Sequence, residues 1–367
     1  MKLIERPIYT EKLLKLINHN EVKILTGVHG AGKSSIIKLF QQKLILRGVE
    51  YTNIISDIND LTENKKRTYL FIDDIRQIKN WKKVISDLKL NFDVDIYINN
   101  SGKSVIDDEL CQMLGHKPIE IEVFPLSFKE SQSFLSFDEY LIYGGMPALL
   151  TTKTDYDIRN IFYSTLAQEV FMVNKIADNA IIISLIKMLL TEIGKIHSFN
   201  SLSKLFANFT DRLPSVKTIE NYIKMLIDSK LFYAIPVFDI KNNMNLIRYA
   251  KYYPVDLSFY KIMFDNPYDC SEKFLESIVY FELLRLGTKV STCKIGNKKV
   301  AFIAENEDNK IYIQVTKSIK GNEKNIFEPL RAINDHYSKW IITLDKVYSH
   351  SHDGIRIINL IDFLIDE

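Results

Sequence analysis

The sequence is poor in cysteine, proline and glycine: its 367 residues include 3 cysteines, 9 prolines and 13 glycines. The cysteines Cys111, Cys270 and Cys293 are odd in number and lack the spacing of a metal site. We therefore expect reduced thiols and a cytoplasmic protein. Collagen-like and low-complexity chains are excluded, and each proline or glycine is expected to mark a turn or a site.

Charge of one sign and long apolar runs are also missing. The 48 basic and 46 acidic residues leave a net charge of +2, so no strong basic field favours nucleic acid, although a local patch stays open. The longest apolar stretch, residues 180–190, contains Ser184 and Lys187 and is too short to span a bilayer. Residues 1–7 lack an apolar core and a cleavage site, so we expect neither a signal peptide nor membrane insertion.

The composition that remains is globular, with 46% hydrophobic and 26% charged residues, and the length predicts two or three domains. Strand and helix patterns alternate through the first half of the chain. Strands are expected at 22–26, 51–55, 69–73, 95–99 and 119–123, and helices at 33–46 and 81–90. This alternation predicts an α/β fold with a mostly parallel sheet and helices on both faces.

The pattern changes after about residue 151. Residues 156–190 are helical in pattern, and two short helices and two strands follow at 201–208, 216–229, 231–238 and 244–250. Two helices followed by a two-stranded wing is the order of a winged helix-turn-helix. The last third reads α-β-β-β-α-β, at 272–286, 289–293, 299–304, 310–315, 324–336 and 339–344.

A phosphate-binding loop is predicted directly after the first strand. Residues 27–34 fit the pattern GxxxxGK[ST] and open a helix, which is the context that supports this motif. Glycines let successive backbone N–H groups point at phosphate oxygens, and the helix dipole adds to this attraction. The lysine reaches the β- and γ-phosphates, and the following hydroxyl binds Mg²⁺. The candidate nucleotide-binding residues are Gly27, Val28, His29, Gly30, Ala31, Gly32, Lys33, Ser34 and Ser35.

Polar residues end the third and fourth predicted strands, at the sheet edge where ligands bind. Asp73 is the candidate Mg²⁺ ligand together with the loop serine, and Asp74 is the candidate for polarising the attacking water. Asp74 is also compatible with a solvated turn. Asn99, Asn100 or Ser101 could sense the γ-phosphate, although asparagine and serine also favour turns for local reasons.

These residues and several other segments resemble a family of prokaryotic ATPases. That family joins an AAA-type ATPase domain to a C-terminal domain of unknown function with a restriction-endonuclease-like fold. The similar segments follow the family's order along nearly the whole chain. They are Arg6-Pro7-Ile8-Tyr9, residues 27–34, 69–74 and 95–98, residues 123–130, Gly144-Gly145-Met146-Pro147, residues 251–256, 275–280 and 311–315. The resemblance implies binding of ATP or ADP with Mg²⁺. It implies an AAA-type domain at 1–150, a helical and winged-helix domain at 151–256, and a restriction-endonuclease-like domain at 257–367.

Departures from the family pattern concern hydrolysis more than binding. His29-Gly30 replaces the usual Arg-Arg and still fits a phosphate loop. Asp73-Asp74 replaces Asp-Glu, and the shorter side chain has less reach toward water. The family's Gly-Arg before the fifth strand becomes Gly115-His116, or Lys117 in an ungapped alignment, so an arginine finger is weakened or lost.

The C-terminal segment departs further from a nuclease. Nucleases of this fold need an acidic residue on the second strand and an acidic-x-Lys set on the third, to hold Mg²⁺. Here Ala301 stands at the first position, Gln314 and Lys317 lie on or after the third strand, and Glu276 remains on the helix. We expect a retained fold without nuclease activity.

The sequence therefore predicts an ATP-binding AAA-type ATPase that hydrolyses ATP slowly as a nucleotide-dependent switch or motor. A non-hydrolysing interaction module and a winged-helix DNA-binding protein are the alternatives. Besides ATP, the candidate partners are a second copy of the chain, DNA, and a protein that the sequence does not name. Binding to a membrane is not expected. The outward residues of the helix at 216–229 are mixed in charge, and the spacing of His350, His352 and Asp353 fits no standard metal site.

Overall fold

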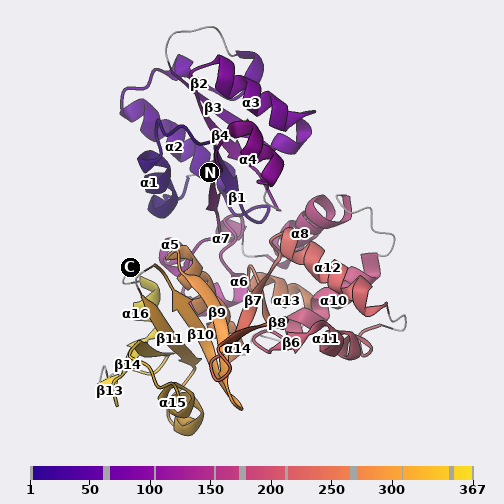
Figure 1. Cartoon of the computed structure of the whole chain (residues 1–367), viewed down its shortest axis with the longest axis vertical. Helices are drawn as coiled ribbons and strands as arrows, with labels where there is room; N and C mark the ends of the chain where they lie inside the picture. Colours follow the sequence, from indigo (N-terminus) through magenta and orange to yellow (C-terminus); the bar gives the residue numbers. More distant parts are fainter. Residues whose placement is uncertain are drawn as a thin grey trace. The chain divides into compact units, whose positions relative to one another are not determined.

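The computed structural model describes residues 3–60, 67–102, 105–152, 154–172, 179–210, 214–264, 271–307, 309–346 and 351–365. Cys270 and His350 lie outside these ranges, whereas Cys111 and Cys293 carry free thiols. The chain folds as two compact units (Figure 1). The N-terminal unit comprises Met1–Pro125 with Asp228–Lys230, and the C-terminal unit comprises Leu126–Ile227 with Leu231–Glu367.

The N-terminal unit contains a parallel sheet with the strand order β2-β3-β4-β1-β5. Its strands are β1 (Lys23–Thr26), β2 (Ile54–Ile55), β3 (Thr68–Asp73), β4 (Val94–Asn99) and β5 (Ile119–Glu122). The predicted parallel α/β sheet is confirmed. The predicted strand at 51–55 is wrong for its first half, because residues Tyr51–Asn53 form a 3-10 turn in which the Asn53 N–H bonds to the Glu50 carbonyl oxygen.

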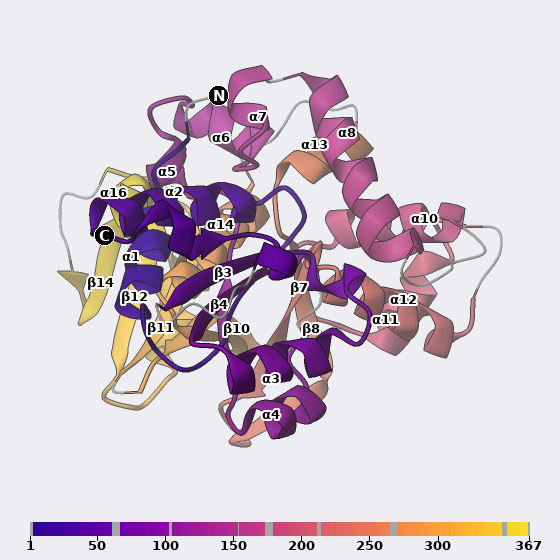
Figure 2. The same cartoon turned by 90° about the horizontal axis from the view of Figure 1, so that it is seen from above.

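Helices cover both faces of this sheet, as expected. Helices α1 (Pro7–Lys15) and α2 (Lys33–Leu46) lie on one face, and α3 (Trp81–Asn91) and α4 (Asp108–Leu114) lie on the other (Figures 1 and 2). On the first face Phe40 of α2 packs against Phe71 and Tyr97, with ring centroids 6.1 and 5.0 Å away. An aliphatic core that includes Ile85 and Leu88 of α3 fills the second face. This packing fixes the strand ends that carry the candidate site.

The C-terminal unit begins with short helices and a helical region. The helices are α5 (Phe128–Ser131), α6 (Phe137–Tyr143), α7 (Leu149–Thr152), α8 (Asp155–Leu166), the π-helical turn η4 (Ala167–Phe171), α10 (Asn179–Thr191), α11 (Phe199–Phe206), α12 (Val216–Asp228) and α13 (Ser258–Met263). The helical pattern predicted at 156–190 is thus divided, and residues 173–178 of it lie outside the described ranges. Ile219, Ile223 and Leu226 of α12 are buried, as the apolar stripe predicts.

A nine-stranded mixed sheet forms the rest of this unit, in the order β13-β14-β12-β11-β10-β9-β7-β8-β6. Its strands are β6 (His197–Ser198), β7 (Phe232–Asp239), β8 (Met244–Pro254), β9 (Lys289–Ile295), β10 (Lys298–Glu305), β11 (Lys310–Thr316), β12 (Ser338–Thr343), β13 (Ser351–His352) and β14 (Ile355–Asn359). The two strands expected as a wing, β7 and β8, belong to this sheet, because β7 pairs in parallel with β9. The winged-helix interpretation and the domain boundary at 256/257 both stay predictions.

Two helices sandwich the middle of this sheet. Helix α14 (Glu272–Arg285) packs on β9, β10 and β11, and α15 (Glu323–Arg331) packs on β10 and β11. The element order α14-β9-β10-β11-α15-β12 is the predicted α-β-β-β-α-β order, followed by β13, β14 and helix α16 (Leu360–Ile365). Helix α15 ends five residues earlier than the predicted 336 (336 − 331). No described helix combines the length and the apolar character needed to cross a bilayer.

Candidate nucleotide-binding site

The loop between β1 and α2 has a backbone that requires glycine. Gly27, Gly30 and Gly32 adopt φ values of 131, 84 and 95°, in the region that side chains with a Cβ atom rarely enter. A Cβ atom on Gly27 would lie 2.1 Å from the Val123 carbonyl oxygen, so the loop also approaches β5 too closely for any side chain. The sequence pattern and the backbone conformation therefore agree on a phosphate-type loop.

Lys33 is the first residue of α2, and its side chain is held inside the loop. The residue is 4% exposed, and its Nζ donates hydrogen bonds to the carbonyl oxygens of Gly27 and Val28, both at 2.9 Å. These carbonyls hold the ammonium group at the mouth of the curled backbone. A bound phosphate would replace them with charged oxygens, which are stronger acceptors for an ammonium group.

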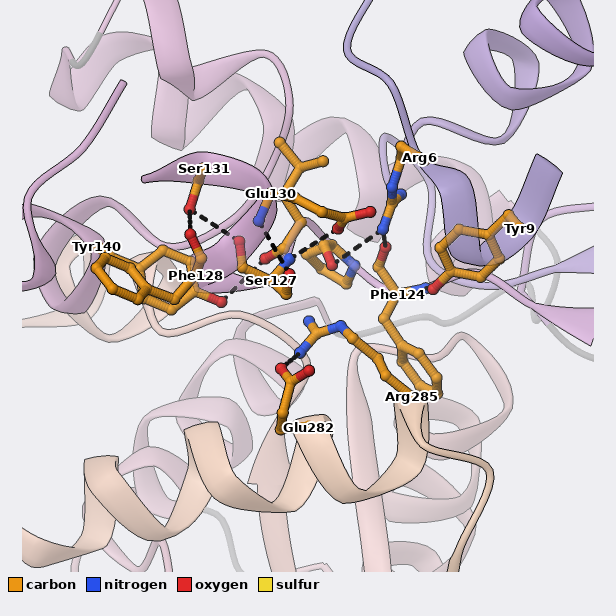
Figure 3. Close-up of polar contacts among 12 residues, drawn as sticks. Arg6, Tyr9, Phe124, Ser127, Phe128, Glu130, Ser131, Tyr140, Glu282 and Arg285 are labelled. Atoms are coloured by element: carbon orange, nitrogen blue, oxygen red, sulfur yellow. Dashed lines mark hydrogen bonds and ion pairs between the residues drawn. The ribbon is translucent and has the colours of Figure 1, made fainter. Parts of the chain in front are cut away.

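Arg6 supports the loop through hydrogen bonds to backbone carbonyl groups, a role that the sequence does not reveal. Its Nη1 donates to the Ala31 carbonyl oxygen at 2.9 Å. Its Nη2 donates to the Phe124 carbonyl oxygen at 3.0 Å (Figure 3). Its guanidinium lies 4.5 Å from the ring centroid of Tyr9, whose hydroxyl accepts the Phe124 N–H at 3.1 Å. The segment at residues 6–9 thus ties the loop to the end of β5, and only its resemblance to the family signals that importance.

Three predicted residues meet at the carboxyl edge of the sheet. The Nδ2 of Asn99 donates to Asp73 Oδ1 at 2.5 Å and to Ser34 Oγ at 3.0 Å. They come from the ends of β4 and β3 and from the first turn of α2, and Asp73 is paired with Asn99 in the strand register. Asn99 is 6% exposed, whereas Ser34 and Asp73 are open to solvent. The Oδ1 of Asn99 is buried and has no hydrogen-bond partner among the described residues.

Asp74 lies at the same edge, but its carboxylate is bound to the turn that follows it. The residue adopts φ 50°, and its Oδ1 and Oδ2 accept hydrogen bonds from Arg76 Nε at 3.0 Å and Gln77 Nε2 at 3.2 Å. Burial alone would raise the pKa of this carboxyl, but the hydrogen bonds from Arg76 and Gln77 outweigh it and lower the pKa. Asp74 is therefore a poor proton acceptor in this arrangement.

Asn100 is fully buried and serves the turn after β4. Its backbone N–H donates to the Leu25 carbonyl oxygen at 2.9 Å, and its Nδ2 donates to the Ser101 carbonyl oxygen at 3.2 Å. Asn99 is therefore the candidate sensor whose side chain joins Ser34 and Asp73. The remaining predicted loop residues surround Lys33, with Ala31 buried and His29 and Ser35 half-buried.

These residues fit ATP and Mg²⁺. A curled backbone at a helix N-terminus suits phosphate, and a hydroxyl beside a carboxylate suits Mg²⁺, which usually keeps water and phosphate oxygens as its other ligands. No group of three or more His, Cys, Asp or Glu side chains that could hold a metal ion occurs in the described parts of the chain. Ser34 and Asp73 are the residues that would hold Mg²⁺ beside a bound nucleotide.

The residues for which the resemblance implies an arginine in related proteins lie just after α4. Gly115 caps that helix with φ 70°, and His116 and Lys117 follow it. The Nδ1 of His116 is buried without a hydrogen-bond partner in the described structure, and Lys117 is exposed. Neither side chain forms a hydrogen bond or ion pair with the described loop residues.

The positions that the resemblance links to a nuclease metal site carry neutral or paired groups. Ala301 is buried, and its N–H donates at 2.7 Å to Oε1 of Gln314, whose Nε2 donates to the Lys299 carbonyl oxygen at 3.3 Å. Glu276 accepts hydrogen bonds from Lys251 Nζ at 3.0 Å and from the Tyr253 hydroxyl. The side chains of Gln314 and Glu276 therefore form hydrogen bonds with other groups of the protein.

Other segments of the family resemblance form structural connections in the C-terminal unit. Ser127 and Glu130 make the capping box of α5, and the Tyr140 hydroxyl donates to the Leu126 carbonyl oxygen at 2.9 Å (Figure 3). The buried Asp256 carboxylate accepts the Gly145 N–H at 2.7 Å and the Ser258 N–H at 2.9 Å. These contacts connect the helices of the C-terminal unit.

Two family models match the chain. Residues 19–132 match a model described as an AAA domain, and residues 135–268 match a domain of unknown function (DUF8612). An uncharacterized protein of Haemophilus influenzae is 29% identical, and the alignment covers 99% of both chains. Uncharacterized protein MJ1544 of Methanocaldococcus jannaschii is 25% identical over 98% of this chain and 88% of that protein.

Among solved structures, a Walker-type ATPase of Pyrococcus abyssi is 11% identical, with a TM-score of 0.44 over 71% of this chain and 95% of that chain. A score this low does not by itself define a shared fold or function. The family match at residues 19–132 agrees with the parallel sheet, the glycine loop and the residues at its edge. The part of the N-terminal unit that holds this sheet, loop and edge is thus the part that matches the AAA-domain model.

Proposed function

We propose that this protein binds Mg-ATP at residues 27–35 and hydrolyses it slowly, as a nucleotide-dependent switch or motor. The observation that carries the proposal is the junction at Asn99, whose amide joins Ser34 and Asp73 beside the buried Lys33. A loop hydroxyl, a strand-end carboxylate and a neighbouring amide are the groups that phosphoryl transfer to water needs around the terminal phosphate.

Each residue has a role in this proposal. The loop N–H groups and Lys33 bind the β- and γ-phosphates, and Ser34 and Asp73 hold Mg²⁺, which neutralises charge on the phosphates. Asn99 orients Asp73, and its unpartnered Oδ1 can accept a hydrogen bond from a water molecule. Hydrolysis is an in-line attack of water on the γ-phosphate, promoted by positioning and charge stabilisation without a covalent intermediate.

Slow turnover follows from two features of the chain. Asp74 is engaged by Arg76 and Gln77, so it is a weak acceptor for the proton of the attacking water. His116 and Lys117 stand where the family has an arginine, and an arginine finger in phosphoryl transfer is worth about 10³–10⁵ in rate.

The test is Mg-ATP binding and phosphate release by the native chain and by Lys33→Ala. Lys38→Ala is the matched control, because Lys38 lies on the same helix with its side chain exposed. We expect the native chain and the control to bind ATP and release phosphate, and Lys33→Ala to do neither. Equal ATP affinity of the native chain and Lys33→Ala would overturn the proposed site.

A non-hydrolysing interaction module is the second candidate, and the engaged Asp74 carboxylate is the observation that favours it. Tight binding of Mg-ATP without phosphate release above the Lys33→Ala background would establish this alternative. Attention would then move to a protein partner whose binding changes with the nucleotide.

DNA association is a weaker extension of the proposal. Lys217 on the outer face of α12 is paired with Glu220 at 3.3 Å, which reduces the positive charge offered to a phosphate backbone. The hairpin β7–β8 is part of the large sheet, whereas a DNA-binding wing usually projects from its module. Retention on duplex DNA that weakens steeply with salt would support DNA binding, and no retention at low salt would remove it.

We further propose that residues 257–367 keep a restriction-endonuclease-like fold without nuclease activity. The element order from α14 to β12 and the neutral Ala301 and Gln314 support this proposal. Cleavage of plasmid DNA in Mg²⁺ or Mn²⁺ that is lost in Glu276→Gln would contradict it.

A further inference from the structure

We propose that Arg76 and Gln77 form a latch that holds the Asp74 carboxylate away from the reaction and thereby limits the rate of ATP hydrolysis. In this proposal Arg76 is a positioning residue, because it acts through Asp74. The inference rests on the proposed function, since it concerns the same site and the same reaction. It deepens that function by treating the contacts of Arg76 and Gln77 with Asp74 as a latch that can open and so sets the rate.

The backbone of Asp74 directs its side chain into the turn. Its φ of 50° places a non-glycine residue in the left-handed region, a strained state that persists only where neighbouring structure holds it. The Asp74 N–H donates to the Asn99 carbonyl oxygen at 2.9 Å, and the Gln77 N–H donates to the Asp74 carbonyl oxygen at 3.1 Å. The fully buried Ile75 anchors the next residue in the core.

Both carboxylate oxygens of Asp74 are then used by that turn. Oδ1 accepts from Arg76 Nε at 3.0 Å, and Oδ2 accepts from Gln77 Nε2 at 3.2 Å. The adjacent carboxylate, Asp73, instead bonds to Asn99 at the end of β4. The two neighbouring acidic residues therefore have separate partners: Asp73 joins the candidate metal site, and Asp74 joins the turn η3 (Ile75–Gln77).

The latch lies at the protein surface, so it can open at moderate cost. The side chains of Asp74 and Arg76 are each 36% exposed, and Gln77 is exposed. Ion pairs with this exposure are weak: they favour the paired over the unpaired state of the two side chains by a factor of about two to five. A carboxylate released from Arg76 could rotate about its side-chain bonds while the backbone stays in place, and could then accept a proton from a positioned water.

The experiment compares kcat and KM for ATP, with Mg-ATP affinity measured separately, in the full chain. We expect Arg76→Ala to raise kcat about two- to fivefold with KM unchanged, and Arg76→Lys to stay near the native rate because an ammonium can still pair with Asp74. Gln77→Ala should raise kcat in the same direction, and adding it to Arg76→Ala should raise kcat further. Lys79→Ala is the matched control, since Lys79 is an exposed cation that follows the same turn.

The same changes made in an Asp74→Ala background separate a latch from other effects. If Arg76 acts through Asp74, Arg76→Ala should no longer change kcat there. A fall in kcat for Arg76→Ala would show that the arginine assists the reaction directly and would overturn the latch, as would an equal rise in both backgrounds. Unchanged kcat with intact ATP binding removes the latch alone, whereas absence of ATP binding in the native chain removes the proposed function itself.

Discussion

At the scale of single residues, the conformation of Gly27 decides whether the phosphate loop can form. Its φ is 131°, and an added Cβ atom would lie 2.1 Å from the Val123 carbonyl oxygen. Gly27→Ala should therefore displace the loop from β5 and abolish Mg-ATP binding. Gly48→Ala is a suitable control, because Gly48 also has a positive φ of 88° but a Cβ atom there meets nothing within 4 Å.

Both variants are measured by ATP titration and by denaturant unfolding. We expect Gly48→Ala to keep native ATP affinity and to lose only about 1–2 kcal/mol of stability, which is the usual cost of a left-handed residue with a Cβ atom. Native ATP affinity in Gly27→Ala would show that the loop does not depend on its approach to β5.

A buried ion pair in the N-terminal unit supports the start of β4. Lys23 Nζ lies 2.6 Å from Asp95 Oδ1, both side chains are fully buried, and Asp95 also accepts from the Tyr97 hydroxyl at 2.9 Å. Burial lowers the pKa of Lys23, although Asp95 partly opposes the shift. Asp95→Ala should leave the ammonium without its counter-charge and cost about 3–5 kcal/mol.

The matched control for this prediction is the more open pair Arg67–Asp93, whose atoms lie 3.3 Å apart and whose side chains are 30% and 57% exposed. Asp93→Ala should cost at most about 1 kcal/mol, because exposed pairs gain little from their attraction. The measurement is the free energy of unfolding in urea for each variant. Equal losses at Asp93 and Asp95 would mean that burial of the pair does not set its importance.

Single residues also show how far the sequence predicts the site. The loop motif identifies Ser34, and the strand ends identify Asp73 and the group Asn99, Asn100 and Ser101, because parallel strands bring their carboxyl ends to one edge. The sequence does not distinguish Asn99 from Asn100 or Ser101. The hydrogen bond between Asp74 and Arg76 depends on a positive φ at Asp74, which is not a glycine, and no local sequence pattern predicts that conformation. Arg6 reaches Phe124, 118 residues away in the chain, and such a distant bond has no local signal either.

At the scale of elements, Asp256 joins the end of β8 to the turn after α6. The carboxylate accepts the N–H groups of Gly145 and Ser258, and an added Cβ atom on Gly144 would lie 1.8 Å from Asp256 Oδ1. Burial raises the pKa of Asp256 above its ordinary value of 3.8, although these hydrogen bonds oppose the shift. This junction should therefore give the fold a dependence on pH.

The sign follows from proton linkage. A carboxyl whose pKa is raised in the folded state binds a proton more readily there than in the unfolded state. Its contribution to the free energy of unfolding is therefore full below pH 3.8 and declines as pH rises through the folded pKa. We expect the free energy of unfolding to lose up to about 1.4 kcal/mol per pH unit from this group in that window. Asp256→Asn should remove this slope, and denaturant unfolding from pH 4 upward, subtracted between the two proteins, measures it. Identical slopes would contradict the prediction.

Most elements were predictable where one local pattern determined them. Helix α2 begins and ends at the predicted residues, and β3 and β4 differ by one residue from prediction. The strand predicted at 51–55 contains strand-forming residues, but the buried Asn53 sits in a turn that overrides this preference. Strand β8 extends to Pro254, past the predicted end at 250, because it continues to pair with β7.

At the scale of the whole molecule, the sequence did not predict that the two candidate wing strands belong to the large sheet. Val237 pairs with Thr292 and Phe238 with Cys293, so β7 is the neighbour of β9 although the hairpin partner β8 and the two helices α13 and α14 separate them in the chain. Pairing between distant strands depends on tertiary packing, and local periodicity carries no information about it. The order of elements was therefore predictable, whereas the pairing of β7 with β9 was not.

The large sheet leads to a prediction about fragments. Residues 126–367 should fold alone, and residues 257–367 should not. A cut at 256/257 would leave β9 without β7, and would leave Glu276 without Lys251, its ion-pair partner at 3.0 Å. It would also expose the rings of Tyr280 and Phe281 on α14, which pack on Tyr253 at 5.5 Å and Tyr233 at 5.1 Å. An edge strand with an exposed apolar face favours aggregation over a stable fold.

The measurement is urea unfolding of both fragments, followed by circular dichroism and by tyrosine fluorescence. For residues 126–367 the two signals should change together in one cooperative transition. For residues 257–367 we expect no cooperative transition or an insoluble product, and residues 231–367, which restore β7 and β8, should recover part of the stability. A cooperative transition of the 257–367 fragment, with a midpoint equal to that of residues 126–367, would mean that the sheet is built from separable domains and that the boundary predicted at 256/257 is a true one.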